Sequence, residues 1–129
     1  LLCKELCRAG VRPDLFVGFR DTTYGMDRFV PWCRDIYAAT DSGKEGHHGL
    51  VTDLLDVSKY DIVLTCGPMV MMRGVAKLCA AAGVPCLASL EMKMACGLGA
   101  CLGCTCHTKI GPVTVCKDGP VFNAQEVFD

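Results

Sequence analysis

Four cysteines constrain this sequence more than any other feature. Cys96, Cys101 and Cys104 have the spacing C-x4-C-x2-C, and Cys116 follows on a separate segment. This is the ligand spacing of plant-type [2Fe–2S] sites. Three thiolates from one short segment must converge on two irons, so that segment has to wrap tightly. The spacing therefore predicts a metal-holding module whose chemistry is one-electron transfer.

Glycines separate the candidate ligands. Gly97, Gly99 and Gly103 stand between the cysteines, and glycine adopts left-handed backbone angles without a steric penalty. We expect these three positions to allow positive φ and to let backbone N–H groups approach the sulfurs. Such N–H groups would offset the negative charge of a cluster and help to set its potential.

Three other interpretations of these cysteines stay open. A structural zinc site could use four cysteines, although such sites usually take them in well-separated pairs. Disulfides would not need the glycines, and a single reactive thiol would not need four partners. Cys106 is a further thiol in the same region. We expect it to lie on the strand that leaves the loop and not to be a ligand.

The remaining cysteines and the charge balance narrow the class of protein. The count of eleven cysteines in 129 residues is odd, and several stand in apolar runs, which favours a reducing, cytoplasmic setting over a disulfide framework. The net charge of −1 leaves no basic surplus for nucleic acid, and no apolar run approaches the roughly 18 residues of a membrane helix. Five cysteines are expected to be buried small hydrophobic residues: Cys3, Cys7, Cys33, Cys79 and Cys86.

The first two-thirds of the chain alternates strand and helix patterns. Apolar runs bounded by turn residues predict strands at 14–19, 36–40, 60–65 and 86–90. Shorter helical patterns occupy the start of the chain, 26–32 and 49–55. Alternation of this kind predicts an α/β fold with a parallel sheet and right-handed crossovers.

The clearest predicted helix runs from Pro68 to Gly83. Proline favours the first helical position and glycine favours the position after the last turn. The apolar face expected to pack on the sheet is formed by four residues: Met71, Val75, Leu78 and Ala82.

The composition changes after Glu91, and short strands are expected at 106–110 and 113–116. We therefore predict two domains without a flexible linker. Residues 1–90 would be a parallel-sheet domain, and residues 91–129 a small cluster-binding module.

Two segments resemble a known family: Met-Ala-Cys-Gly-Leu-Gly-Ala-Cys-Leu-Gly-Cys at 94–104 and Val-Cys-Lys-Asp-Gly-Pro-Val-Phe at 115–122. The family is the electron-transfer subunit of class 1B dihydroorotate dehydrogenase, within the ferredoxin-reductase superfamily. Upstream, residues 17–20, 39–41 and 60–69 are similar in order to the nucleotide-binding half of that family, which is shared with other flavin reductases. The resemblance implies that residues 1–90 are the C-terminal part of an NAD-binding, ferredoxin-reductase-like domain.

The resemblance implies a function and its cofactors. Electrons would pass between NAD(H) and FAD, then through a [2Fe–2S] cluster to the FMN of a separate subunit that oxidises dihydroorotate to orotate in pyrimidine biosynthesis. By this resemblance, the cluster ligands would be Cys96, Cys101, Cys104 and Cys116. No residue of this chain is expected to be catalytic, and the partner is expected to be the FMN-containing subunit in a hetero-oligomer.

Five residues are candidates for nucleotide contacts. Cys66, Gly67 and Pro68 match the superfamily motif at the nicotinamide end, although a plain strand-to-helix turn would look the same. Asp41 follows a predicted strand and is placed to bind an adenosine ribose and repel a 2′-phosphate, or it is simply a turn residue. Arg20 either approaches the nucleotide or is a solvated strand end.

Two rivals remain. Another reductase-like subunit, of the sulfide dehydrogenase or NADH-dependent ferredoxin:NADP oxidoreductase type, is similar in fold but typically has Asp as first cluster ligand, where this chain has Cys96. A structural zinc module is the alternative of another class. The family's flavin-binding barrel and Gly-rich nucleotide turn find no counterpart here, and we expect this chain alone, without its FAD site, not to be a competent enzyme.

Overall fold

The computed structural model describes residues 1–128 and divides the chain into two compact units. The first is Leu1–Leu55 and the second begins at Asp56. The domain boundary predicted near residue 91 stays a prediction.

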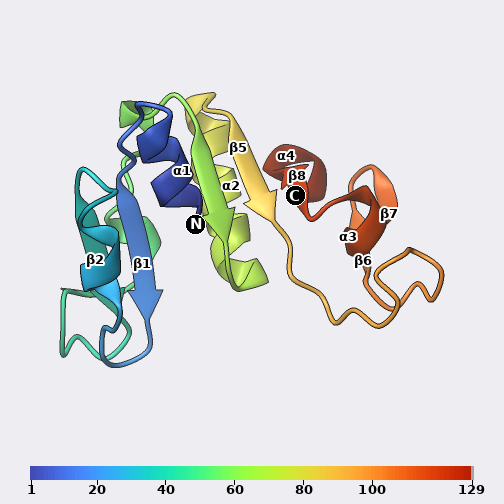
Figure 1. The fold of residues 1–129 in the computed structure, drawn as a ribbon, viewed down its shortest axis with the longest axis horizontal. Coiled ribbons are helices and arrows are strands. Elements are labelled where there is room, and N and C mark those ends of the chain that lie inside the picture. The colour runs from blue at the N-terminus through green and yellow to red at the C-terminus, as the bar shows by residue number, and fades with distance from the viewer. Residues whose placement is uncertain (129) are drawn as a thin grey trace. The chain divides into compact units, whose positions relative to one another are not determined.

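The first unit contains a parallel sheet of the order β1-β2-β3 (Figure 1). Its elements are α1 (Leu2–Arg8), β1 (Leu15–Phe19), the 3-10 turn η1 (Met26–Phe29), β2 (Ile36–Thr40), β3 (His47–His48) and η2 (Val51–Asp53). Phe19 pairs with Thr40 in the register of β1 and β2. The following residues, Arg20 and Asp41, therefore leave the sheet at the same edge.

The second unit contains a sheet of the order β4-β5-β8 and a separate β6-β7 hairpin. Its elements are η3 (Val57–Lys59), β4 (Val63–Cys66), α2 (Met69–Ala82), β5 (Cys86–Ser89), β6 (Thr105–Thr108), β7 (Gly111–Thr114), α3 (Val115–Asp118), β8 (Val121–Asn123) and α4 (Ala124–Val127). β4 and β5 are parallel, with α2 as their crossover, whereas β8 is antiparallel to β5. The predicted α/β class and parallel pairing are confirmed.

The boundaries of α2 agree with the sequence, but its buried face does not. Pro68 is the N-cap and Gly83 closes the helix in the left-handed conformation, with φ of 68°. The predicted face was wrong at Met71, Leu78 and Ala82, which are not buried. The buried residues are Met72, Val75, Ala76 and Cys79. Both stripes have helical spacing, and only the position of the sheet under α2 decides between them.

Several strand limits also differ from the predictions. β4 begins at Val63 and not at Tyr60, because η3 occupies residues 57–59 and Tyr60 is its C-cap. β7 ends at Thr114, so Cys116 lies on the short helix α3 and not on a strand. β8 was not predicted. It is only three residues long, which is too short for alternation to be seen in the sequence.

The core of the second unit lies between α2, β5 and the chain after β7. Met72, Cys79, Ala88, Val115 and Ala124 are each completely buried. Leu90, at the end of β5, is buried beside them and donates its N–H to the Pro120 carbonyl at 2.9 Å. Among residues 1–128, no helix is long and apolar enough to cross a membrane.

Candidate metal centre

The cysteine loop, residues 91–104, connects β5 to β6 without a helix or strand of its own (Figure 1). Its backbone reverses direction through left-handed residues. Gly97 has φ of 68° and Gly99 has φ of 78°, as the sequence predicts, but Gly103 is not left-handed. Leu102 takes that conformation instead, with φ of 58°. A left-handed leucine costs roughly 1–2 kcal/mol, so the surrounding loop must hold it there.

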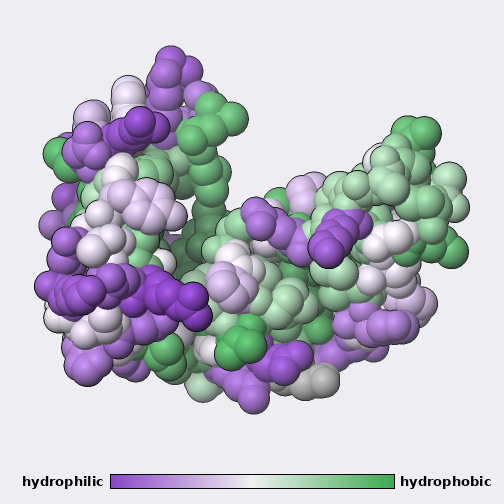
Figure 2. Space-filling model, turned by 90° about the horizontal axis from the view of Figure 1, so that it is seen from below, coloured by the Kyte–Doolittle hydropathy of each residue, from purple (hydrophilic) through white to green (hydrophobic). Residues whose placement is uncertain are grey.

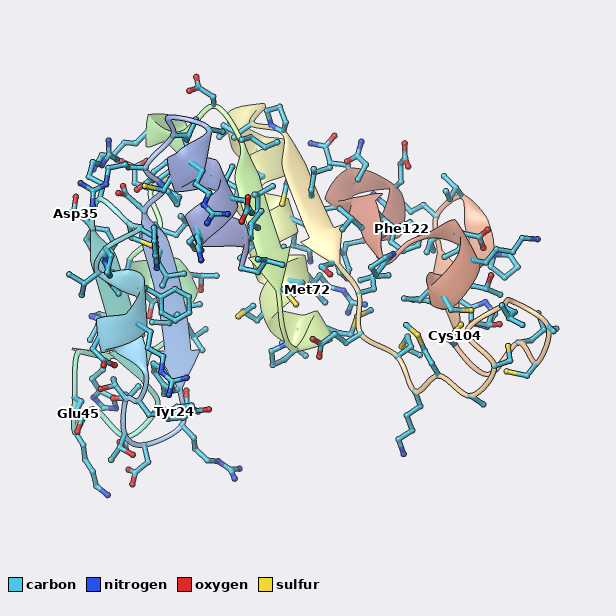
Figure 3. All side chains as sticks on the ribbon, viewed as in Figure 1. Tyr24, Asp35, Glu45, Met72, Cys104 and Phe122 are labelled. Carbon is cyan, nitrogen blue, oxygen red and sulfur yellow. The ribbon has the colours of Figure 1, made fainter. Side chains whose placement is uncertain are left out.

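The four candidate sulfurs approach one another as two pairs. The Cys101 thiol donates to the Cys96 sulfur, and the Cys116 thiol donates to the Cys104 sulfur. Cys104 is buried, and Figure 3 shows it where the loop returns to β6. The Val115 N–H donates to the Cys104 carbonyl at 3.2 Å, which brings the start of α3 and its Cys116 beside the end of the loop.

Backbone N–H groups surround these sulfurs. The Cys96 sulfur accepts from the N–H groups of Leu98 at 3.3 Å and Cys101 at 3.4 Å. The Gly103 N–H donates to the Cys101 sulfur, and the Cys116 N–H to the Cys104 sulfur, both at 3.4 Å. Such donors stabilise the thiolate form, which is the form that binds metal.

The hydrogen bonds set the charge of each pair. N–H donation from Cys101 and Leu98 lowers the pKa of Cys96 to about 6. The pKa of Cys104 is also lowered, chiefly by the N–H of Cys116. The pKa of Cys116 is raised, because its thiol donates to Cys104. The hydrogen bonds thus favour the thiolate form of Cys96 and Cys104 over that of Cys116.

The donor set fits a two-iron group. A binuclear cluster takes four thiolates divided between two irons, and Cys96, Cys101, Cys104 and Cys116 form two sulfur pairs. Within residues 1–128, no three His, Cys, Asp or Glu side chains converge at the distances of a single metal ion. The assignment of Cys96, Cys101, Cys104 and Cys116 as ligands stays a prediction.

The other cysteines differ in exposure. Cys33, Cys79 and Cys86 are buried as expected, whereas Cys3 and Cys7 are partly exposed, contrary to the prediction. Burial is the main cause that raises the pKa of Cys33 to about 11 and that of Cys86 to about 12. Cys106 is also buried.

Cys106 lies on β6, as expected. Its thiol donates weakly to the His107 carbonyl at 3.9 Å. That Cys106 is not a cluster ligand remains a prediction.

A second polar group forms where β4 and β5 end. Cys66 and Ser89 are register partners, and the Cys66 thiol lies 3.7 Å from the Glu91 carboxylate. Burial and the Glu91 charge raise the pKa of Cys66, while a hydrogen bond from Ser89 opposes them. Gly67 has φ of 144°, and a side chain there would meet Met71. Ser89 and Glu91 were not predicted as site residues, because only the strand register brings them to Cys66.

The other two nucleotide candidates lie in the first unit. Arg20 and Asp41 are exposed beyond the carboxyl ends of β1 and β2. Their neighbours are paired: Lys44 donates to Asp21 at 2.7 Å, and the Thr23 N–H donates to Glu45 at 2.7 Å. Among the residues that the structure describes, neither Arg20 nor Asp41 forms an ion pair. The structure does not place them relative to Cys66.

Known proteins resemble this chain both in its cysteine-containing segment and along most of its length. Residues 91–128 match the model of the iron-sulfur cluster binding domain of dihydroorotate dehydrogenase B. A solved NADH-dependent reduced ferredoxin-NADP oxidoreductase, described in relation to flavin-based electron bifurcation, aligns with a TM-score of 0.82 and 30% identity over 98% of this chain and 48% of that chain. The chain thus has a fold of the ferredoxin-reductase type and contains a segment that matches an iron–sulfur domain.

The curated relatives are more specific. The dihydroorotate dehydrogenase B (NAD(+)) electron transfer subunit of Clostridium perfringens is 46% identical over 117 residues, which is 91% of this chain and 48% of the relative. That of Clostridium acetobutylicum is 43% identical over 127 residues, 98% of this chain and 51% of the relative. The chain is similar to this family of electron transfer subunits and spans about half the length of the curated relatives it matches.

The N–H bonds to Cys96 predict its reactivity in the metal-free, reduced chain. Because the pKa is lowered to about 6, the thiolate dominates above that pH, and its contribution to folding is lost as pH falls through about 6. Alkylation of Cys96, followed by mass spectrometry across a pH series, should be half-maximal near pH 6. Cys86, whose pKa is about 12, is the internal control and should stay unmodified. A Cys96 midpoint near 9 would contradict the loop geometry.

Proposed function

We propose that this protein carries electrons between NAD(H)/FAD and the FMN of a dihydroorotate dehydrogenase catalytic subunit, one at a time. The observation that carries the proposal is the arrangement of Cys96, Cys101, Cys104 and Cys116 as two sulfur pairs amid backbone N–H donors. The similarity of the chain to electron transfer subunits of dihydroorotate dehydrogenase B and the match of residues 91–128 to an iron–sulfur domain support it.

The four cysteines would hold a [2Fe–2S] cluster, two on each iron. When bound, such a group supplies a one-electron step between two flavins that lie too far apart for hydride transfer. The residues of the loop would fix its position and its electrostatic environment. The N–H donors to the Cys96, Cys101 and Cys104 sulfurs stabilise negative charge there.

The cysteine loop is also the proposed docking surface for the FMN-containing subunit. One-electron transfer falls steeply with distance, so the loop that holds the cluster must approach the partner. Leu98 is 79% exposed and Leu102 is 62% exposed, and Figure 2 shows the hydrophobic surface at the right-hand end, where the loop lies. Exposed apolar patches usually mark partner contacts. A partner seated on the loop would remove the exposed side chain of Leu102 from water.

The proposed nucleotide site lies at the carboxyl ends of the parallel strands. Ligands of open α/β sheets bind outside the carboxyl ends of parallel strands. Cys66, Gly67 and Pro68 occupy such an end and lead into α2, whose N-terminus favours anions. Asp41 and Arg20 occupy the corresponding ends in the first unit. We assign Cys66–Pro68 to the nicotinamide end of NAD(H) and Asp41, with Arg20, to the adenosine end.

The proposal extends to the whole protein and its setting. FAD would bind largely outside this chain, and the assembly would be a hetero-oligomer that acts in pyrimidine biosynthesis in the cytoplasm. The eleven cysteines, all of them free thiols, support a reducing compartment.

A second candidate function has structural support. The solved NADH-dependent reduced ferredoxin-NADP oxidoreductase shares 30% identity with this chain, against 46% for the clostridial dihydroorotate dehydrogenase relative. The compound that reduces the cluster distinguishes the two candidate functions. Reduction of the cluster by dihydroorotate, in the presence of the FMN subunit, supports the first function, whereas reduction only by ferredoxin or NADPH supports the second.

The ligand assignment predicts the effects of serine substitutions. Cys96→Ser, Cys101→Ser, Cys104→Ser and Cys116→Ser should each damage or abolish the cluster, because each sulfur belongs to one of the two pairs. Cys106→Ser is the matched control and should retain it. Iron and sulfide analysis with EPR of the dithionite-reduced protein measures the outcome. A normal signal in Cys116→Ser together with its loss in Cys106→Ser would refute the choice, and zinc without iron in the parent protein would refute the cluster.

The Asp41 assignment predicts cofactor preference in the intact FAD-loaded subunit. NADH should be preferred over NADPH, because the Asp41 carboxylate would repel a 2′-phosphate by about 1–3 kcal/mol. Asp41→Asn should raise the ratio of kcat/KM for NADPH to that for NADH by about tenfold or more. Asp21→Asn is the control, because Asp21 is paired with Lys44. Equal preference for both donors in the parent subunit would count against the assignment.

The docking assignment predicts how the exposed leucines behave. Leu98→Asp or Leu102→Asp should weaken association with the FMN subunit by about 1–3 kcal/mol and leave the spectrum of the cluster unchanged. Ile110→Asp is the control, because Ile110 is 62% exposed but lies in the β6–β7 turn. Leu102→Gly should raise the stability of the chain by roughly 1 kcal/mol yet still weaken binding. Calorimetric titration measures the affinities, and unchanged affinity in both Asp variants would contradict the assignment.

A further inference from the structure

The side chain of Lys117 lies across the cysteine loop. Lys117 follows Cys116 on α3, and its Cβ, Cγ and Cδ atoms occupy the space in front of Gly99. A Cβ atom added to Gly99 would stand 3.1 Å from Lys117 Cβ and 2.8 Å from Lys117 Cδ. Any side chain at residue 99 would therefore displace the lysine. The aliphatic stem of Lys117 covers the backbone midway between Cys96 and Cys101.

Gly99 is constrained from the other side as well. Its φ of 78° is left-handed, and its N–H donates to the Cys116 sulfur. This hydrogen bond lowers the pKa of Cys116, whereas the hydrogen bond to Cys104 and burial raise it. The stem of Lys117 and the sulfur of Cys116 thus both meet Gly99. The contact joins α3 to the middle of the loop, where the two sulfur pairs approach each other.

The Lys117 ammonium carries a positive charge at the end of this stem. Of the residues that the structure describes, no carboxylate lies within ion-pair distance of the Lys117 ammonium. The adjacent Asp118 carboxylate accepts from the Thr114 N–H at 2.6 Å and the Thr114 hydroxyl at 2.9 Å. Lys117 acts on Asp118 only through its charge, which helps to lower the pKa of that carboxyl.

The sign of the electrostatic effect follows from Coulomb's law. A cluster held by four thiolates gains one further negative charge when it accepts an electron. A cation nearby stabilises the more negative, reduced form more than the oxidised form. Charge near a cluster is one of the factors that set its potential.

We propose that Lys117 is a positioning residue of the metal centre, which packs its stem over Gly99 and, by its charge, makes the cluster easier to reduce. The inference rests on the proposed ligand set. It goes beyond that set because Lys117 is not a ligand and acts on the driving force of electron transfer. The electron itself comes from the donor to the cluster, and no bond to Lys117 forms or breaks.

The test uses three variants of the full chain, loaded with iron and sulfide. Lys117→Met keeps an aliphatic stem and removes the charge, and Lys117→Arg keeps both the stem and the charge. Lys109→Met removes the same charge from the β6–β7 turn, outside the loop. Potentiometric titration followed by EPR gives the midpoint potential of each.

Lys117→Met should shift the midpoint to a more negative value. At a fixed ambient potential, the ratio of reduced to oxidised cluster should fall by about threefold to tenfold, where tenfold corresponds to 59 mV for a one-electron couple. Lys117→Arg should retain the parent potential, and Lys109→Met should shift it much less than Lys117→Met. The shift should also shrink at high salt, because the exposed charge is screened.

Three results would overturn the proposal: a parent potential in Lys117→Met, an equal shift in Lys109→Met, or a shift in Lys117→Arg as large as that in Lys117→Met. If Lys117→Met does not hold a cluster, the Arg variant and the salt dependence of the parent potential decide. The parent potential should then become more negative as salt rises, and a salt-independent parent potential would overturn the assignment. Failure of the parent chain to bind iron and sulfide would instead refute the proposed ligands, so the two failures are distinguishable.

Discussion

The bond between a backbone N–H group and a cysteine sulfur is the interaction on which this centre depends. A loop can point several N–H groups at its own sulfurs only if the chain folds back on itself, and that requires left-handed residues. Gly97, Gly99 and Leu102 supply them. The result is a segment without regular structure whose conformation is nevertheless determined, because each turn delivers a donor to a sulfur.

The rest of the second unit holds the two ends of that loop. At one end the Leu90 N–H bonds to the Pro120 carbonyl, just before β8. At the other, buried Cys104 receives the Val115 and Cys116 N–H groups. The late elements of the chain, α3 and β8, thus return to a loop whose first residues follow β5. This return explains why the fourth sulfur comes from a separate segment: it is delivered by the same turn that fastens the end of the loop.

The same strand, β5, connects the loop to the proposed nucleotide site. Ser89 ends β5 beside Cys66, and Glu91 begins the cysteine loop within reach of the Cys66 thiol. Only four residues separate Glu91 from Cys96. A polar site at the strand ends and a sulfur site in the loop are therefore built on consecutive parts of one segment. This continuity is consistent with the proposed electron transfer, because a short stretch of backbone sets the spacing between the two sites.

The sequence by itself determined the features that local chemistry dictates. The cysteine spacing indicated the candidate metal centre, and the strand Ile36–Thr40 was predicted at its observed limits. Pro68 and Gly83 marked the two ends of α2. These features are predictable because ligand spacing, strand composition and helix capping act over a few neighbouring residues. The tertiary structure decided the rest. The buried stripe of α2 depends on the sheet beneath it, and Glu91 meets Cys66 only through the register of β4 and β5. Leu102, and not Gly103, is left-handed because contacts around the loop outweigh the preference of the single residue.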